Sequence, residues 1–452
     1  MKIIVVGCGK IGRTLVQNLV LEGHDVVAID SETSVLEEIT NMYDVMCVCG
    51  NGVDYDTLFE AGAKQAEIVI SVTGSDEFNM LSCFMAKRMG AQHTIARIRN
   101  PGYNGHDYAF VKQHLELSLA INPELLAAHE IFNILKLPSA VNVETFSRRN
   151  FEMVEIRLKP ESALHDMKVM EVRKKYPGNF LISVVQREDK VFIPDGNFVL
   201  KSGDKIGLIA APTEIQKLLK KLGILQKQAR NVMILGGGKI GYYLAKMLLG
   251  SGNSVKIIDR DIERCKELSN ELTGAVIING NGAEQEVLLS EGINNVDAFV
   301  ALTGMDEENI LISFYASSQN VPKVISKVNR AEIAAMAEKL GLDSIISPKK
   351  SVTDVILSYA RAIQNSVGSK VETLYKLMDD KAEALEFIVG EDFKSLGVPL
   401  KDMKIKDDIL IAGIISGRKA IIPSGEDVID VGDRVIVIAA GQKMDDLSDI
   451  LK

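Results

Sequence analysis

Apolar positions alternate between two spacings along the first hundred residues. Short runs rich in β-branched residues are typical of buried strands, and the segments between them carry apolar residues at helical spacing. Strands that alternate with helices in this way predict a parallel sheet with helices on both faces. The expected strands are 3–7, 25–30, 45–49, 67–72 and 94–98.

The spacing changes further along the chain. Helical segments at 107–116 and 124–135 lead out of the first sheet. Residues 151–158 and 205–209 then alternate apolar with polar side chains, a period of two that is typical of strands with one exposed face. We therefore expect a small α+β module after the parallel sheet.

The whole pattern recurs in the second half of the chain. The offset between matching segments stays between 225 and 230 residues over six landmarks, so the chain is a tandem duplication. The clearest matches are Gly7 with Gly236, Asp30 with Asp259, Gly50-Asn51-Gly52 with Gly280-Asn281-Gly282, and Thr73-Gly74 with Thr303-Gly304.

The duplication predicts an α/β protein with two Rossmann-type, doubly wound parallel-sheet domains, each followed by a small α+β C-terminal module. The expected bounds are 1–122 for the first Rossmann-type domain, 123–146 for a linker helix, 147–228 for the first module, 229–347 for the second Rossmann-type domain, 348–374 for a second linker helix, and 375–452 for the second module.

Each copy places a glycine motif between its first strand and first helix. Gly7, Gly9 and Gly12 have the GxGxxG spacing, and Asp30 ends the second strand 18 positions later. Such glycines allow a tight turn, a close approach of backbone to a pyrophosphate, and packing of the helix on the sheet. The helix N-terminus attracts phosphate, and Asp30 would accept hydrogen bonds from ribose hydroxyls. The alternative is that the glycines serve only a tight turn. The presence of both the glycines and the acid in two copies disfavours this alternative.

Further candidates stand at the carboxyl ends of later strands, where parallel sheets bind ligands. Thr73-Gly74 follows the fourth strand, and Arg97 could place a cation beside a nucleotide unless it merely faces solvent. Asp76 and Asp306 are expected to cap the next helix. The expected ligand-binding set is Gly7, Cys8, Gly9, Lys10, Ile11, Gly12, Asp30, Thr73, Gly74 and Arg97, with Gly236, Gly237, Gly238, Lys239, Ile240, Gly241, Asp259, Thr303, Gly304 and Lys327 in the second copy.

The ribose acids also constrain the ligand. A carboxylate at this position repels a 2′-phosphate, so NAD(H) or an adenine nucleotide fits better than NADP. Arg260 follows Asp259 and could soften that rule in the second copy. A residue that would recognise the nicotinamide half is not evident.

Composition narrows the class of protein. A net charge of −9 argues against duplex nucleic acid as a partner. The five cysteines are too few and too uneven for a disulfide framework, and we interpret them as buried small hydrophobes. Cys47 and Cys49 would share a face of one strand, but nothing nearby completes a metal site. No apolar run approaches the ~18 residues that span a bilayer, and the start does not resemble a signal peptide, so we expect a cytoplasmic protein.

An enzymatic role is disfavoured. Hydride transfer by a dehydrogenase needs a general acid or base, yet all six histidines lie in the first half, which excludes a duplicated histidine-based active site. We expect no catalytic residues. A redox-sensing transcription factor is the other alternative, but a basic helix-turn-helix segment is not apparent.

Taken in order, these motifs resemble the RCK (KTN) regulators of potassium transport over essentially the whole chain. The resemblance implies that NAD(H) first, or ATP/ADP, is held by the glycine loops and strand ends. It also implies a homo-oligomeric ring, tetramer first and dimer second, peripheral at the inner face of the membrane. The implied partner is an integral membrane potassium-translocating subunit of the Trk or Ktr type. Lys327 departs from the pattern, because the first copy has Arg97 there.

Overall fold

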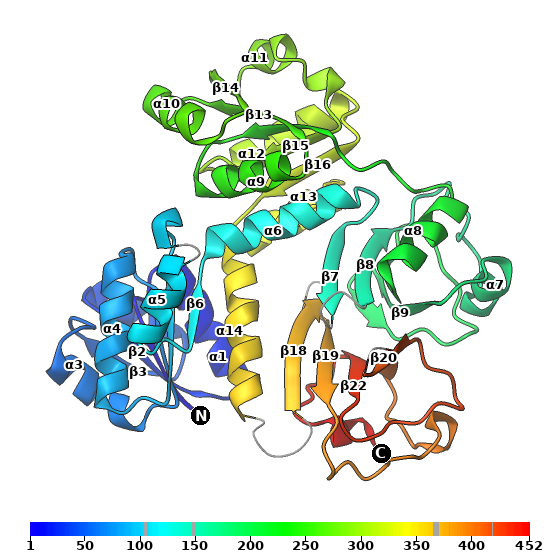
Figure 1. Ribbon diagram of the computed structural model, residues 1–452, viewed down its shortest axis with the longest axis horizontal. Coiled ribbons are helices and arrows are strands. Elements are labelled where there is room, and N and C mark those ends of the chain that lie inside the picture. The colour runs from blue at the N-terminus through cyan, green and yellow to red at the C-terminus, as the bar shows by residue number, and fades with distance from the viewer. Residues whose placement is uncertain (104–105, 147–150, 365–369, 379, 418) are drawn as a thin grey trace. The chain divides into compact units, whose positions relative to one another are not determined.

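The computed structural model describes residues 1–103, 106–146, 151–364, 370–378, 380–417 and 419–452. Within these residues the chain forms two parallel and two antiparallel sheets (Figure 1). It divides into two compact units, one of residues 1–127 with 347–360 and one of residues 128–346 with 361–452.

The first parallel sheet has the strand order β3-β2-β1-β4-β5-β6, which confirms the doubly wound topology. The central strand is wholly buried at Ile3, Ile4 and Val5, since helices cover both faces. Predicted strand bounds agree with the observed ones to within one residue, but the sixth strand was not predicted because three residues give no periodic signal. The elements are β1 (Lys2–Val6), α1 (Lys10–Leu21), β2 (Asp25–Asp30), α2 (Thr33–Met42), β3 (Met46–Cys49), α3 (Tyr55–Glu60), β4 (Ile68–Ser71), α4 (Asp76–Met89), β5 (His93–Arg97), α5 (His106–His114) and β6 (Leu119–Ile121).

The second parallel sheet repeats this topology in the order β14-β13-β12-β15-β16-β17. Its last strand is again short, with two residues. The elements are β12 (Asn231–Leu235), α9 (Lys239–Gly250), β13 (Ser254–Asp259), α10 (Ile262–Glu271), β14 (Val276–Asn279), α11 (Gln285–Ser290), β15 (Ala298–Ala301), α12 (Asp306–Ser318), β16 (Lys323–Lys327), α13 (Ala331–Lys339) and β17 (Ile345–Ile346).

The two linker helices are shorter than the sequence predicted. The first was expected over 123–146, but α6 (Pro123–Lys136) ends two residues before Pro138, which cannot continue a helix. Residues 142–146 instead form β7 of the first module. The second was expected over 348–374, whereas α14 (Pro348–Gln364) is followed by β18 (Lys370–Leu377).

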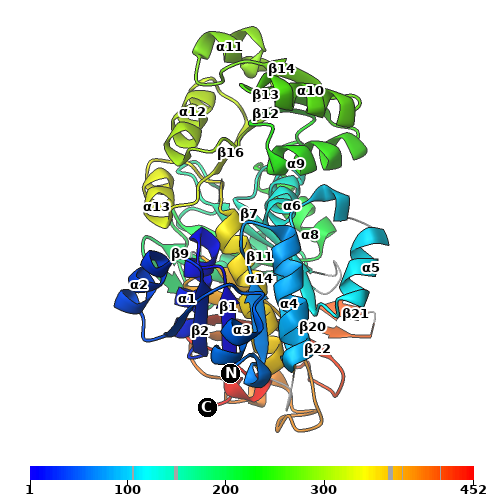
Figure 2. The same cartoon turned by 90° about the vertical axis from the view of Figure 1, so that its left-hand side faces the viewer.

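Each linker contacts the Rossmann-type domain of the other half. Residues 347–360 of the second linker belong to the first compact unit, where α14 lies beside the first parallel sheet (Figure 1 and Figure 2). There the hydroxyl of Tyr359 is 3.1 Å from Nδ1 of His93. In the second unit, Nζ of Lys323 on β16 donates to the carbonyl of Ala140, which follows α6, at 2.6 Å. Each linker therefore also contacts the parallel-sheet domain of the other half, while the start of α6 stays with its own domain through Glu124.

The small modules are antiparallel sheets, with strand orders β10-β9-β11-β8-β7 and β18-β19-β22-β20-β21. Residues from both modules, among them Phe151, Ile209, Ala384 and Ile436, form one buried apolar cluster, so the sheets pack on each other. The first module contains β7 (Asn142–Phe146), β8 (Phe151–Arg157), α7 (Val169–Lys175), β9 (Phe180–Arg187), β10 (Lys190–Phe192), β11 (Lys205–Ala210) and α8 (Pro212–Lys221), and the second adds β19 (Ala382–Ile388), β20 (Ile409–Ser416), β21 (Lys419–Ile421) and β22 (Arg434–Ala440) to β18.

The buried contact at Lys323 gives a testable pH dependence. Burial lowers the pKa of Lys323 from 10.5 to about 8. Between these values the unfolded chain binds the proton and the folded chain does not, so stability should rise as pH rises. Relative to Lys323→Met, the wild type should gain about 3 kcal/mol of unfolding free energy between pH 8 and 10.5. Denaturant unfolding of both proteins across this range measures the difference. Lys174→Met removes an exposed lysine and serves as control, and a pH-independent difference at Lys323 would contradict the assignment.

Candidate nucleotide-binding sites

The glycine loops have the close packing that the motif predicts. Gly7 follows β1 with φ +88°, a left-handed conformation that favours glycine. A Cβ on Gly12 would lie 2.0 Å from the carbonyl oxygen of Gly7, so the first turn of α1 packs directly on the loop. In the second copy a Cβ on Gly241 would lie 2.4 Å from the carbonyl oxygen of Gly236. These glycines are required by the fold itself.

Other glycines of the motif face open space. Gly9 and Gly238 are the residues before α1 and α9, with φ near −65° and −62°. A Cβ added to either would meet nothing within 4 Å. The same is true of Gly74 and Gly304, which follow β4 and β15. Neither crowding nor backbone conformation explains these four glycines, and all lie at the carboxyl edge of a parallel sheet.

The two acids at the ends of β2 and β13 are already hydrogen-bonded within the protein. Oδ2 of Asp30 accepts the N–H of Cys8 at 2.6 Å, and Oδ1 accepts the N–H of Glu32 at 3.0 Å. Asp259 accepts the N–H of Gly237 at 2.6 Å in the same way. A carboxylate oxygen has a second lone pair, so ribose hydroxyls remain possible partners. The acid therefore also anchors the loop, a role that the sequence did not reveal.

An asparagine that sequence reasoning passed over joins two strand ends. Oδ1 of Asn79 accepts the N–H of Thr73 at 2.8 Å and its hydroxyl at 2.7 Å, while Nδ2 donates to the carbonyl of Arg97 at 2.9 Å. Asn309 bonds the N–H of Thr303 and the carbonyl of Lys327 at the same distances, 2.8 and 2.9 Å. The asparagine recurs six residues after the threonine in both copies, and this repetition could have identified it from the sequence.

The expected capping role of Asp76 and Asp306 is wrong. Ser75 is the N-cap of α4, and its side chain accepts the N–H of Phe78. Oδ2 of Asp76 instead accepts the N–H groups of Arg99 and Asn100 at 2.9 and 2.8 Å. The aspartate lies inside the first turn, so its side chain reaches across to the loop after β5 rather than back along its own helix.

Asp306 makes the equivalent contacts in the second copy. It accepts the N–H groups of Asn329 and Arg330, both at 3.0 Å. Burial opposes its ionisation, but these hydrogen bonds outweigh burial and hold the pKa of Asp306 below its ordinary value. The negative charge that results is directed toward the loop after β16.

The cations at the ends of β5 and β16 have different surroundings. Arg97 lies largely buried, with a terminal nitrogen 3.6 Å from Oε1 of Glu124. Burial lowers the pKa of Arg97, although Glu124 opposes that shift. Among the described residues, its Nε has no hydrogen-bond partner. Nζ of Lys327 lies 3.5 Å from the carbonyl of Leu302 at the end of β15.

The remaining loop residues divide into exposed and buried positions. Lys10 and Lys239 are exposed at the start of their helices, whereas Ile11 and Ile240 are buried in the core. Gly237 stands where the first copy has Cys8, and a Cβ on Gly237 would lie 2.4 Å from a methyl carbon of Leu268.

Cysteine burial was predicted only in part. Cys8, Cys83 and Cys265 are buried, and burial raises the pKa of the Cys8 thiol to about 12. Cys47 is half-buried and Cys49 is exposed, so the expectation was wrong for these two. Both cysteines lie on β3, which is the edge strand of the first sheet. An edge strand has a neighbouring strand on one side only, so its side chains are less completely covered.

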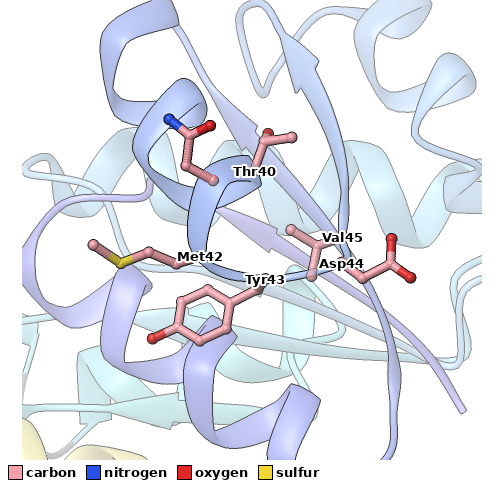
Figure 3. A pocket seen from close by; sticks show the side chains of 6 residues that line it. Thr40, Met42, Tyr43, Asp44 and Val45 are labelled. Atoms are coloured by element: carbon pink, nitrogen blue, oxygen red, sulfur yellow. The ribbon is translucent and has the colours of Figure 1, made fainter.

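A surface hollow of about 330 Å³ lies elsewhere, at Thr40–Val45 (Figure 3). The end of α2 and the residues that lead into β3 form it, so it lies at the amino edge of the sheet, opposite the glycine loops. In the described part of the chain, groups of three or more His, Cys, Asp or Glu placed to hold a metal are absent. The described helices include none long and apolar enough to cross a membrane.

Comparison with known proteins agrees with the duplicated plan. The model of the TrkA-N domain matches residues 3–115 and 232–348, and that of the TrkA-C domain matches residues 153–223 and 384–452. The solved RCK domain of GsuK superposes with a TM-score of 0.62 at 17% identity, covering 97% of this chain and 92% of that one. The GsuK channel bound to NAD has a TM-score of 0.62 at 16% identity, covering 97% and 76%. The fold is thus that of a tandem RCK protein.

Full-length relatives refine this class. The chain is 31% identical over 453 residues to the Trk system potassium uptake protein TrkA homolog of Archaeoglobus fulgidus, with 100% of both chains covered. It is 30% identical over 449 residues to the Trk system potassium uptake protein TrkA of Vibrio alginolyticus, with 98% and 96% covered. The chain belongs to the TrkA family of Trk system potassium uptake proteins.

The contrast between crowded and open glycines predicts different stabilities. Gly12→Ala forces a methyl group against a carbonyl oxygen and should lower the unfolding free energy by about 1–3 kcal/mol. Gly9→Ala meets no atoms and should cost less than about 1 kcal/mol. Denaturant unfolding of the two variants tests this. Equal destabilisation would show that the space at Gly9 is needed by the fold.

Proposed function

We propose that this protein is a non-enzymatic regulatory subunit that binds NAD(H) or ATP/ADP and controls a membrane potassium-translocating subunit. The observation that carries the proposal is the open space at Gly9 and Gly238. Crowding explains Gly7 and Gly12, whereas for Gly9 and Gly238 a fold-only account offers only the general preference for glycine over alanine at a helix N-cap. A phosphate group near the first N–H groups of α1 and α9 would occupy that space and be attracted by the helix N-terminus.

Several other residues at the same edge support a nucleotide. Asp30 and Asp259 keep acceptor capacity for ribose hydroxyls and disfavour a 2′-phosphate. Arg97 ends β5 at this edge and would place a cation beside the nucleotide. The solved GsuK structures include complexes bound to NAD and to ADP. The proposed ligand-binding residues are those expected from the sequence, in both copies.

A dehydrogenase fits the site less well. His24 precedes β2 and His93 begins β5, so both lie at the amino edge of the first sheet, away from the glycine loops. Cys8 is part of the first glycine loop, but the raised pKa of its thiol keeps it protonated at neutral pH. The described glycine loops hold no histidine, and their glycines, lysines and hydrogen-bonded acids are suited to binding and orienting a nucleotide.

The partner and the assembly follow from the family. We propose an integral membrane potassium-translocating subunit of the Trk or Ktr type, with this protein bound at its cytoplasmic face. Duplicated domains offer repeated surfaces, which favour closed symmetric assembly, as a tetramer first and a dimer second. A change of bound nucleotide can shift such an assembly only through a difference in affinity between its states.

Nucleotide binding is tested by calorimetry with NADH and ADP. Gly9→Asp places bulk and negative charge in the open space of the first site, and Gly238→Asp does so in the second. Each variant should lose one class of sites, and the double variant should lose both. Gln17→Asp adds the same charge on an exposed turn of α1 and should change nothing. Full binding by the double variant would refute the proposed sites.

Coupling to transport is tested by reconstitution with the potassium-translocating subunit. Moving a two-state equilibrium from mostly closed to mostly open needs about 5.5 kcal/mol of differential affinity, whereas one site typically supplies about 1–3 kcal/mol. We therefore expect both sites of each chain to contribute additively. Each single variant should retain part of the nucleotide-dependent potassium flux, and the double variant should retain none. If one single variant abolishes the response and the other changes nothing, one half is only a scaffold.

A further inference from the structure

The residue between the first two glycines of each loop is held on both sides. In the first copy, the N–H of Cys8 donates to Asp30 at 2.6 Å, and its carbonyl accepts Nε of Arg13 at 3.2 Å. In the second copy, the N–H of Gly237 donates to Asp259 at 2.6 Å. We call this arrangement of acid, loop residue and guanidinium the loop clamp.

The second loop clamp takes its guanidinium from a different helix. Nε of Arg264 donates to the carbonyl of Gly237 at 2.7 Å. Arg264 belongs to α10, whereas Arg13 belongs to α1. At the position of Arg13, the second copy has Tyr242, and at the position of Arg264, the first copy has Val35. The two copies therefore make the same contact from different places in the chain.

A glutamate at one shared position holds each guanidinium from the other side. Arg13 pairs with Glu38, which lies on α2. Arg264 pairs with Glu267 on α10 at 2.8 Å. Glu38 and Glu267 are each the sixth residue of their helix. In both copies, a guanidinium thus lies between the loop carbonyl and a glutamate at the same helix position, although the arginine comes from a different helix.

Peptide geometry gives this contact a consequence. The carbonyl of Cys8 and the N–H of Gly9 belong to one planar trans peptide and point in opposite directions. Fixing the carbonyl on Arg13 therefore fixes the N–H of Gly9 on the other side of the loop. That N–H precedes the first turn of α1, where a Cβ on Gly9 would meet open space. The same holds for the peptide between Gly237 and Gly238.

We propose that Arg13 and Arg264 are positioning residues that orient the N–H groups of Gly9 and Gly238 toward a phosphate of the bound nucleotide. This proposal rests on the proposed nucleotide binding. It adds that each arginine acts on the ligand indirectly, through the backbone of its loop. Glu38 and Glu267 complete the clamp by fixing the guanidinium. The contact with the ligand is made by the loop, not by the arginine.

The first site is tested in full-length protein whose second site is blocked by Gly238→Asp, with ADP as the probe. Arg13→Gln should weaken ADP binding about tenfold. Moving the arginine to its place in the second copy, with Arg13→Tyr and Val35→Arg together, should restore affinity to within about threefold of the parent. Thermal unfolding of each variant identifies any that fail to fold. The transposed variant makes the proposal falsifiable even if Arg13→Gln is unstable.

Glu38→Gln separates positioning from direct contact. If Arg13 positions the loop, loss of Glu38 loosens the guanidinium and ADP binding weakens. If Arg13 binds phosphate itself, loss of a competing carboxylate strengthens ADP binding, and that result would overturn the proposal. Unchanged affinity in Arg13→Gln, or a failure of the transposed variant to regain affinity while folded, would overturn it as well. A parent protein that binds neither ADP nor NADH would instead refute the nucleotide-binding proposal itself.

Discussion

The absence of a side chain at Gly12 and Gly241 allows the contact on which each parallel-sheet domain depends. The first helix packs so closely on the preceding loop that a Cβ would lie 2.0 or 2.4 Å from a carbonyl oxygen. This approach directs the helix N-terminus at the carboxyl edge of the sheet. The acid of the second strand, the Thr-Gly segment of the fourth and the cation of the fifth then face the same edge, because parallel strands end together. The close packing of the first helix on the loop thus also brings the candidate nucleotide-binding residues together.

The sequence predicted the parallel-sheet domains closely, because β-branched runs separated by helical spacing leave few alternatives. It also predicted which glycines and acids meet at the sheet edge, since the motif has a fixed place in this fold. The short strands β6 and β17 were missed, as two or three residues carry no period. The capping role of Asp76 failed because the side chain had a tertiary alternative in the loop after β5. The loop clamp was invisible, because Arg13 and Arg264 occupy different positions in the repeat.

The two copies keep geometry more strictly than residue identity. Cys8 becomes Gly237, and Arg97 becomes Lys327, yet the hydrogen bonds of Asp30 and Asp259 to the loop have equal lengths. The small modules share the apolar cluster between their sheets, but α7 and α8 of the first module have no α-helical counterpart among the described residues of the second. The contact that orients the loop backbone is therefore reproduced although the loop residue itself differs.

The place of α14 beside the first parallel sheet has a consequence for how this chain is made. The first compact unit consists of residues 1–127 and 347–360, so its last element leaves the ribosome long after its first. At about 5–20 residues per second, the intervening synthesis takes on the order of 10–40 seconds. During that time the surface that receives α14, including His93, is exposed on the nascent chain. The first domain therefore receives α14 only after more than half of the second copy has been translated.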